Sequence, residues 1–255
     1  MSLEIVIVPC LADNYAYLVK STADPKASLI DAPEDAAIDA ALRDRGWDLG
    51  TILITHHHAD HVDGVPGLLA RYDAEVIGPA VEIAKLPKLD RAVAEGDTGG
   101  SGVAAWQVLE VPGHTLGHIA YHFATAGAVF TADSLMALGC GRVFEGTPQT
   151  MWESLRKLAA LPPETQVYSG HEYTQTNAAF ALTVEPDNAA LTERAQAIGT
   201  ARAAGRPTVP VSLALELDTN PFLRAHLDRV KQAVGMAGAA DAEVFAEIRH
   251  RKDRF

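Results

Sequence analysis

Cysteine is scarce in this sequence, and long apolar runs are missing from it. The 255 residues include only two cysteines, Cys10 and Cys140. Two cysteines allow at most one disulfide, so a fold held together by cystines is excluded and we expect two small buried thiols. No run of about eighteen apolar residues occurs, which predicts no membrane span and no membrane partner.

Positive charge is also in deficit. Asp and Glu number 33 against 21 Lys and Arg, and the net charge is -12 at pH 7. Binding to phosphates requires a basic face, so we expect no nucleic-acid partner. The first nine residues lack the basic segment and the apolar length of a secretory signal, which favours a cytoplasmic protein. We expect a monomer that acts on a small molecule.

What the sequence does contain is a dense cluster of metal-ligand types. Four histidines and one aspartate occur within Thr55–His61, directly after the apolar run Thr51–Ile54. Downstream, Asp63 offers an N-cap and Pro66 an early helix position, which predicts a turn between a strand and a helix. Imidazole and carboxylate are ligands that zinc, iron and manganese accept. The cluster is therefore interpreted as a metal-binding turn.

Three later positions carry single ligand types directly after predicted strands. His114 follows the strand predicted for 105–111, Asp133 follows 128–131, and His171 follows 167–169. Each one alone is more typical of an ordinary turn. Because sites in α/β folds are built at strand ends, we expect the side chains to converge at one sheet edge. No spacing argument involves the remaining histidines, which are assigned to packing or to the surface: His118, His122, His226 and His250.

The coarse pattern predicts two domains. A β-rich α/β domain is expected for residues 1–173 and a helical domain for residues 174–255, because the pattern is helical throughout beyond Thr174. The first domain should include a helix over 33–45 that ends at Gly46 and a helix capped by Thr147. Further strands are predicted at 3–8, 15–20, 27–32, 75–78 and 119–123.

The ligand pattern resembles that of the metallo-β-lactamase fold superfamily. The resemblance covers His56-x-His58-x-Asp60-His61 followed by His114, Asp133 and His171. It implies a four-layer αββα sandwich, followed here by the small helical domain, and two divalent metal ions. Zinc is expected first, with iron or manganese as alternatives. By this resemblance His56, His58 and His114 hold one metal, Asp60, His61 and His171 hold the other, and Asp133 bridges them. His57 should point away, since alternate side chains of an extended segment project oppositely.

Other segments narrow the resemblance to glyoxalase II, the hydroxyacylglutathione hydrolases. These segments are Asp13–Leu18, Gly139–Gly146, Gly170–Thr174, Asn220–Arg224 and Arg249-x-x-Lys252-Asp253-x-Phe255. The resemblance implies hydrolysis of the thioester S-D-lactoylglutathione to D-lactate and glutathione, the second step of methylglyoxal detoxification. A hydroxide that bridges the metals would be the nucleophile, with Asp60 and Asp133 as the catalytic carboxylates.

The resemblance also implies a site for the glutathione moiety. Its residues would be Arg142, Phe144, Tyr173, Arg249 and Lys252. Two substrate carboxylates on a protein of net charge -12 require cations gathered locally, and Arg249 and Lys252 offer them. The family commonly has Lys and Tyr where this chain has Arg142 and Phe144, so one phenolic hydrogen bond worth about 0.5–1.5 kcal/mol is lost.

Several alternatives share parts of this pattern. A persulfide dioxygenase with one iron shares the first motif, and a lactonase or β-lactamase shares the fold. A nuclease of the same fold is disfavoured by the acidic charge. A purely structural zinc site is closed and usually rich in cysteine, unlike this His and Asp set.

Overall fold

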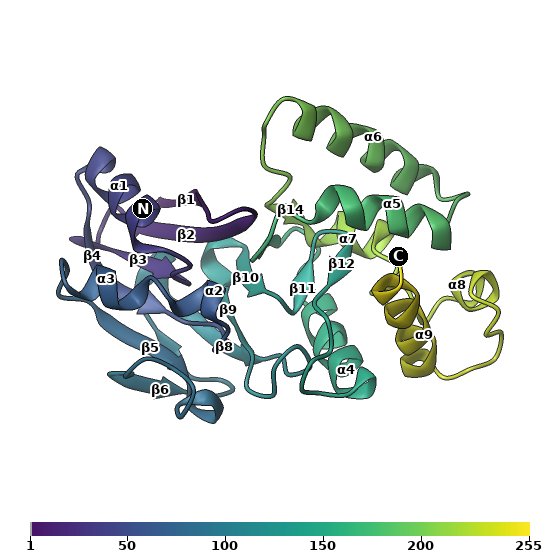
Figure 1. The fold of residues 1–255 in the computed structure, drawn as a ribbon, viewed down its shortest axis with the longest axis horizontal. Coiled ribbons are helices and arrows are strands. Elements are labelled where there is room, and N and C mark those ends of the chain that lie inside the picture. The colour runs from purple at the N-terminus through teal and green to yellow at the C-terminus, as the bar shows by residue number, and fades with distance from the viewer. Residues whose placement is uncertain (1) are drawn as a thin grey trace. The chain divides into compact units, whose positions relative to one another are not determined.

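The strands near the start of the chain pair in their order along the sequence. In the computed structural model, which describes residues 2–255, one sheet has the order β1 to β6 (Figure 1). The first two pairings, β1–β2 and β2–β3, are antiparallel, and the next three are parallel. The strands are β1 (Leu3–Cys10), β2 (Asn14–Ser21), β3 (Lys26–Ile30), β4 (Asp48–Leu53), β5 (Glu75–Pro79) and β6 (Arg91–Val93).

Helices make the parallel crossovers of this sheet. Helix α1 (Asp35–Arg45) joins β3 to β4, while α2 (Ala59–Val62) and α3 (Val65–Leu69) lie between β4 and β5. Ile38 and Leu42 of α1 are fully buried in a core cluster that also includes residues of β1 to β5. Gly46 ends α1 in the left-handed conformation, at φ 64°, as a C′ glycine should.

A second, antiparallel set of strands faces the first sheet. It contains β7 (Thr98–Gly99), β8 (Trp106–Glu110), β9 (Ile119–Phe123) and β10 (Ala128–Ala132), paired in chain order. The rings of Tyr17 on β2 and Phe130 on β10 pack with centroids 5.3 Å apart. The Tyr121 hydroxyl on β9 donates to the Ile54 carbonyl at 3.0 Å. Apolar side chains from two sheets therefore form a shared interior.

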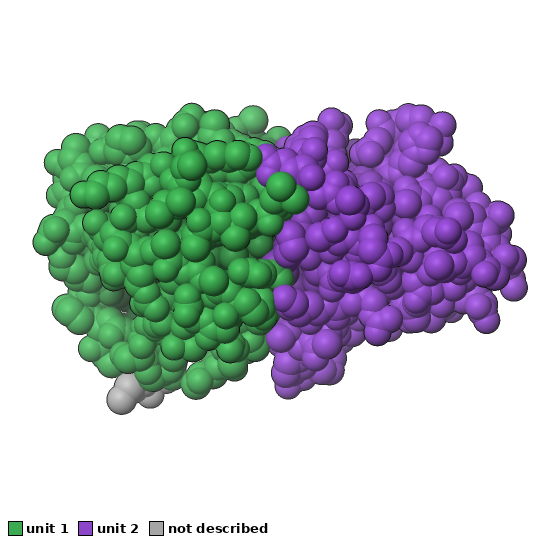
Figure 2. Space-filling view, turned by 90° about the horizontal axis from the view of Figure 1, so that it is seen from below, with its two compact units in different colours: residues 1–110, 115–131 green, residues 111–114, 132–255 purple. Residues whose placement is uncertain are grey.

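The chain divides into two compact units, coloured separately in Figure 2. The first contains the described residues up to Glu110 together with Thr115–Thr131, and the second contains Val111–His114 and Ala132–Phe255. The second unit is mostly helical, and its fully buried rings include Phe180, Phe222 and Phe245. Its elements are β11 (Leu135–Met136), β12 (Gly139–Cys140), α4 (Pro148–Ala159), β13 (Gln166–Ser169), α5 (Thr174–Val184), α6 (Ala189–Ala203), β14 (Val211–Ser212), α7 (Leu213–Thr219), α8 (Asp228–Ala233) and α9 (Asp241–Asp253).

Most of the predicted elements are confirmed. The strand at 119–123 has the predicted bounds, and the Thr147 hydroxyl accepts a hydrogen bond from Thr150 N at 3.1 Å as the N-cap of α4. Cys10 and Cys140 are free and buried, as expected. Within residues 2–255, no helix has the length and apolar character needed to cross a membrane.

One predicted cap is wrong. Asp63 does not begin the helix that contains Pro66, because it ends α2 in a helical conformation, and the N-cap of α3 is Gly64. Long-range hydrogen bonds decide this geometry: Ala32 N donates to His61 O and Gly64 N donates to Ala32 O, both at 2.8 Å. The two-residue strands of the hairpin β11–β12 and the strand β14 were not predicted at all.

Candidate metal centre

The first group of ligand candidates lies in the turn between β4 and α2. The side chains of His56 and His58 face each other, with His56 Nε2 and His58 Nδ1 3.1 Å apart. Two nitrogens that share a tetrahedral zinc ion at about 2.0–2.1 Å lie about 3.3 Å from each other. The spacing of this pair therefore fits joint coordination of one metal ion.

Asp31 orients two of the imidazoles. Its Oδ2 accepts hydrogen bonds from His61 Nδ1 and from the Thr55 hydroxyl, each at 2.8 Å, and its Oδ1 accepts one from Thr55 N. Since the Thr55 hydroxyl donates to Asp31, it accepts the hydrogen of His56 Nδ1, 3.0 Å away. Both histidines then carry the proton on Nδ1, and Nε2 is the metal-binding nitrogen.

Asp31 could also be read as a ligand, because its oxygen lies close enough to His56 and His61 to form a metal-binding group. Its carboxylate, however, already accepts three short hydrogen bonds. The residue is buried and has φ 55°, a left-handed conformation that is costly for an aspartate. We assign it the role of orienting the ligands.

Asp60 is held from the other side by Asn14. The Asn14 amide donates to the Asp60 carbonyl at 3.0 Å and to its carboxylate Oδ2 at 3.1 Å. Asp60 Oδ2 lies 3.9 Å from His61 Nε2. The segment around Asn14, which carried part of the sequence resemblance, therefore sets the rotamer of a predicted ligand.

His57, between two ligand candidates, takes a different partner. Its Nδ1 lies 2.9 Å from Glu82 Oε2, and Glu82 also accepts a hydrogen bond from Gly117 N at 3.0 Å. Glu82 is buried and thereby ties the turn to the loop before β9. His118, assigned to packing, is fully buried and stacks on the His56 ring at 4.5 Å.

The second group of ligand candidates belongs to the other compact unit. Asp133 Oδ2 lies 3.3 Å from His114 Nε2 and 3.4 Å from His171 Nε2. His114 Nδ1 donates to the Arg142 carbonyl at 2.8 Å, which fixes Nε2 as the nitrogen that faces Asp133. One carboxylate oxygen between two imidazole nitrogens matches the donor set expected of a bridging ligand.

Two aromatic residues with a predicted substrate role lie beside these histidines. The Tyr173 ring stacks on His171 at a centroid distance of 4.6 Å and an angle of 6°. The Phe144 ring lies 5.3 Å from the His114 ring and is 60% exposed. Both rings are accessible, so they can contact a bound ligand next to the metal-binding nitrogens.

The predicted cations gather in the second unit. Burial lowers the pKa of Lys252, and the positive charges of Arg249 and Arg142 lower it further, against the opposing effect of Asp253. Arg249 is buried, and its guanidinium donates to the Cys140 carbonyl at 2.9 Å and pairs with Asp253. Arg142 and two cations of α9, far from it in the sequence, thus come close enough to repel one another, and a bound anion would relieve this repulsion.

The predicted seven ligands are thus four from one unit and three from the other, and each group is drawn together within its unit. Sequence reasoning missed Asp31, Asn14 and Glu82, which hold the ligands. Asp31 directly follows β3 and could have been found by the rule that identified His114 and Asp133.

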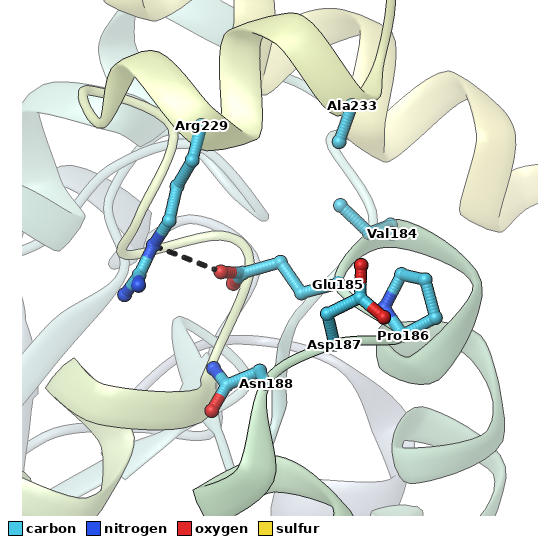
Figure 3. A pocket seen from close by; sticks show the side chains of 7 residues that line it. All are labelled: Val184, Glu185, Pro186, Asp187, Asn188, Arg229 and Ala233. Carbon is cyan, nitrogen blue, oxygen red and sulfur yellow. Dashed lines mark ion pairs between the residues drawn. The ribbon is translucent and has the colours of Figure 1, made fainter.

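A hollow of about 190 Å³ in the second unit contains none of the predicted residues (Figure 3). It is lined by Val184, Glu185, Pro186, Asp187, Asn188, Arg229 and Ala233.

Comparison with known proteins identifies two family models that cover nearly the whole chain. A model of the metallo-beta-lactamase superfamily matches residues 13–171, and one described as hydroxyacylglutathione hydrolase C-terminus matches residues 172–255. Hydroxyacylglutathione hydrolases of Ruegeria pomeroyi and Cereibacter sphaeroides are 60% and 58% identical to this chain over 255 residues, 100% of each chain. The similarity is continuous across both parts.

Solved structures agree on the fold. ETHE1 from Myxococcus xanthus is 27% identical with a TM-score of 0.66, over 99% of this chain and 90% of its own. TTHA1623, in a di-iron-bound form, is also 27% identical with a TM-score of 0.63, over 86% of this chain and 100% of its own. The expected fold class, a metallo-β-lactamase domain followed by a C-terminal helical domain, is confirmed.

Proposed function

Because this chain belongs to the hydroxyacylglutathione hydrolases of the metallo-beta-lactamase superfamily, we propose that its seven ligand candidates hold two divalent metal ions. The chain is a metal-dependent hydrolase that cleaves hydroxyacylglutathione thioesters. The observation that carries the metal proposal is the position of Asp133 Oδ2 within 3.4 Å of two imidazole nitrogens. The proposed ligands are His56, His58 and His114 for one ion, Asp60, His61 and His171 for the other, and Asp133 for both.

The donor set supports zinc as the first candidate. Imidazole with carboxylate also suits iron and manganese, so ligand chemistry favours this group of metals over magnesium or calcium. Metal ions held by these residues would lower the pKa of a bound water toward neutrality and would polarise the acyl carbonyl. Through Asp31, directly or by way of the Thr55 hydroxyl, and through the Arg142 carbonyl, the protein holds His61, His56 and His114 in the tautomer that can bind a metal.

We assign the glutathione moiety to the cations of the second unit. Lys252, with Arg142 and Arg249, would bind the substrate carboxylates, and the exposed Phe144 and Tyr173 would contact the rest of the glutathione moiety. Arg249 has backbone and carboxylate partners already, so Lys252 is the stronger candidate for direct contact. The departing thiolate needs no general acid, because a thiol of pKa about 8.5 leaves readily.

We propose D-lactoylglutathione as the substrate, a monomer as the active form and the cytoplasm as its location. We also propose a catalytic domain of residues 1–173 and a substrate-binding domain of residues 174–255. The family models meet between residues 171 and 172, close to this boundary. The C-terminal match disfavours the persulfide dioxygenase, lactonase and β-lactamase alternatives.

Lys252→Met tests the substrate assignment. Its kcat/KM on lactoylglutathione should fall about 10–100-fold, since a charge-assisted hydrogen bond contributes about 1.5–3 kcal/mol, and the loss should lie mainly in KM. Its rate on a thioester without glutathione should stay at the wild-type level. Lys88→Met, at an exposed position, is the matched control and should leave both substrates unaffected.

Metal content and the pH dependence of KM test the same proposal. Metal analysis of the wild type should find two ions per chain, and a chelator that removes them should abolish hydrolysis of both thioesters. The lowered pKa of Lys252 implies that KM for lactoylglutathione rises with pH already below 10.5, as the free enzyme loses this positive charge. Equal losses by Lys252→Met on the two thioesters would refute the glutathione assignment.

A further inference from the structure

A short buried hairpin, Leu135–Cys140, separates the proposed bridging ligand Asp133 from Arg142. Its strands β11 and β12 pair through only two residue pairs, Leu135 with Cys140 and Met136 with Gly139. All six residues are buried. A ribbon of this size is not stable alone, and buried backbone groups must find partners. The surroundings must therefore impose its conformation.

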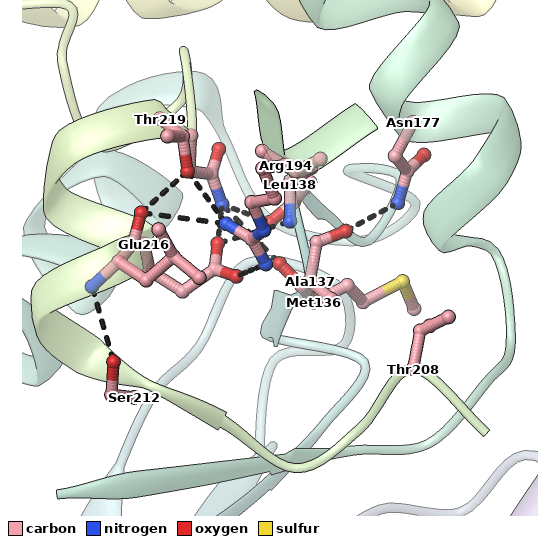
Figure 4. Close-up of polar contacts among 12 residues, drawn as sticks. Met136, Ala137, Leu138, Asn177, Arg194, Thr208, Ser212, Glu216 and Thr219 are labelled. Carbon is pink, nitrogen blue, oxygen red and sulfur yellow. Dashed lines mark hydrogen bonds and ion pairs between the residues drawn. The ribbon is translucent and has the colours of Figure 1, made fainter. Parts of the chain in front are cut away.

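Side chains from the helices of the same unit supply those partners (Figure 4). They bind four carbonyl groups and one N–H of the hairpin. Asn220 Nδ2 donates to the carbonyls of Met136 at 3.2 Å and Gly139 at 3.0 Å, Asn177 Nδ2 to Ala137 at 3.0 Å, Arg249 Nη1 to Cys140 at 2.9 Å, and Leu138 N donates to Glu216 Oε2 at 3.0 Å.

The two central side chains, Glu216 and Asn220, are themselves held in place. Glu216 is fully buried, and its charge is compensated by an ion pair with Arg194. Asn220 Nδ2 lies 2.8 Å from Glu216 Oε2, and Asn220 Oδ1 accepts a hydrogen bond from Phe222 N at 3.0 Å. The accepted hydrogen bond fixes which side of the amide points at the hairpin, so Asn220 presents its hydrogens to the carbonyls.

The other end of the loop reaches the proposed ligands. Gly141 N donates to the Asp133 carbonyl at 3.0 Å, and the Arg142 carbonyl accepts the hydrogen bond from His114 Nδ1 at 2.8 Å. A Cβ at Gly141 would lie 2.0 Å from the Asp133 carbonyl oxygen and 2.8 Å from His114 Nδ1. The backbone between the hairpin and the ligands is therefore packed so closely that it leaves no room for a side chain at Gly141.

We propose that Asn220 and Glu216 are positioning residues for the metal centre. By holding the hairpin they fix the backbone of Asp133 and Arg142, and through the Arg142 carbonyl they fix the His114 ring. The inference rests on the proposed function, in which Asp133 and His114 are metal ligands. Neither Asn220 nor Glu216 contacts the ligand atoms, so the effect is transmitted by the backbone.

Asn220→Ala in the full-length protein tests this inference. Affinity for Co²⁺ should fall, by at most the about 10–100-fold that follows the loss of a direct partner of a metal ligand, because Asn220 acts on the ligands through the backbone. The visible absorption bands of bound Co²⁺ should also shift. With saturating metal, kcat should fall while KM for lactoylglutathione stays at the wild-type value. The matched control is Asn188→Ala, which removes an N-cap on α6 and a bond to the Asp218 carbonyl but no hairpin contact.

Asn188→Ala should lower the thermal unfolding midpoint yet bind Co²⁺ as the wild type does. An Asn220→Ala protein with wild-type Co²⁺ affinity and spectrum would overturn the inference, whatever its thermal stability. If Asn220→Ala does not fold, Asn177→Ala decides in its place: weaker Co²⁺ binding supports the inference and unchanged binding contradicts it. A wild-type protein that binds no metal would instead refute the proposed function.

Discussion

At the scale of single residues, the metal site depends on the residues that hold the ligands as well as on the ligands themselves. Asp31 accepts hydrogen bonds from His61, from Thr55 and, through the Thr55 hydroxyl, orders His56. Such partners fix the tautomer and raise the basicity of an imidazole ligand. Loss of the Asp31 carboxylate should therefore change the orientation of both His56 and His61.

Replacing Asp31 by Ala should weaken metal binding about 10–100-fold, because neither imidazole would then be held with Nε2 as its metal-binding nitrogen. Metal content after dialysis against graded chelator concentrations measures the effect. Asp39→Ala is the control: Asp39 is also buried and hydrogen-bonded, but to Tyr72 and Arg43. It should lose stability and keep its metal, and equal metal loss in both variants would contradict the role given to Asp31.

The ligands themselves could be predicted from the sequence, because His and Asp are metal-binding residue types and their spacing along the chain is informative. Of the residues that hold them, Asn14 and Glu82 could not be predicted, since Asn14 reaches Asp60 across 46 positions and Glu82 reaches His57 across 25. Such pairs depend on which strands become neighbours. Arg249 illustrates the same limit: its charge is evident in the sequence, but its hydrogen bond to Cys140 is not.

At the scale of helices, two glycines have open space where a side chain would lie. Replacing them changes the stability through the backbone conformation alone. A Cβ at Gly46 or at Gly199 would meet no atom within 4 Å. Gly46 has φ 64° and ends α1, whereas Gly199 lies inside α6. Packing is thus the same in both cases, and only the backbone conformation differs.

Gly46→Ala should lower the free energy of unfolding by about 1 kcal/mol, because an L-residue is strained in the left-handed region. Gly199→Ala should raise it by about 0.5–1 kcal/mol, since alanine is the better helix former. Urea unfolding of both variants beside the wild type provides the measurement. The same sign of change in both variants would contradict this account.

Elements with strong local patterns were predictable, and those fixed by distant contacts were not. The short, mostly apolar run of β9 and the Thr147 cap of α4 are local signals. The hairpin β11–β12 has no turn residue at its tip, where Leu138 adopts φ 56°. Its conformation comes from Asn177 and Asn220, whose positions follow the hairpin by about forty and eighty residues.

At the scale of the whole molecule, the two thiols report on the two compact units separately. Cys10 lies in the first unit and Cys140 in the second, and both are buried. Burial raises the pKa of Cys10 to about 12 and that of Cys140 to about 11. In the folded protein neither forms the reactive thiolate near neutral pH.

A thiol reagent at pH 8 should therefore label no cysteine in the native protein and two in the unfolded protein. Labelling along a urea gradient, read separately for each cysteine, shows whether the two units unfold together. The raised pKa values also imply that stability falls as pH rises above about 8.5, since the unfolded thiols lose protons that the folded ones retain. Rapid native labelling of either cysteine would contradict this prediction.

The bond between Arg249 and the Cys140 carbonyl has a consequence for biosynthesis. Arg249 follows Cys140 by 109 positions. At about 5–20 residues per second, a ribosome needs roughly 5–20 s to add them. Throughout that interval the nascent chain already contains Asp133 and His114, but the segment between Asp133 and Arg142 lacks the hydrogen bond from Arg249. We therefore expect metal uptake to be completed only after α9 has been synthesised, so that newly made protein passes through a metal-poor stage before it becomes active.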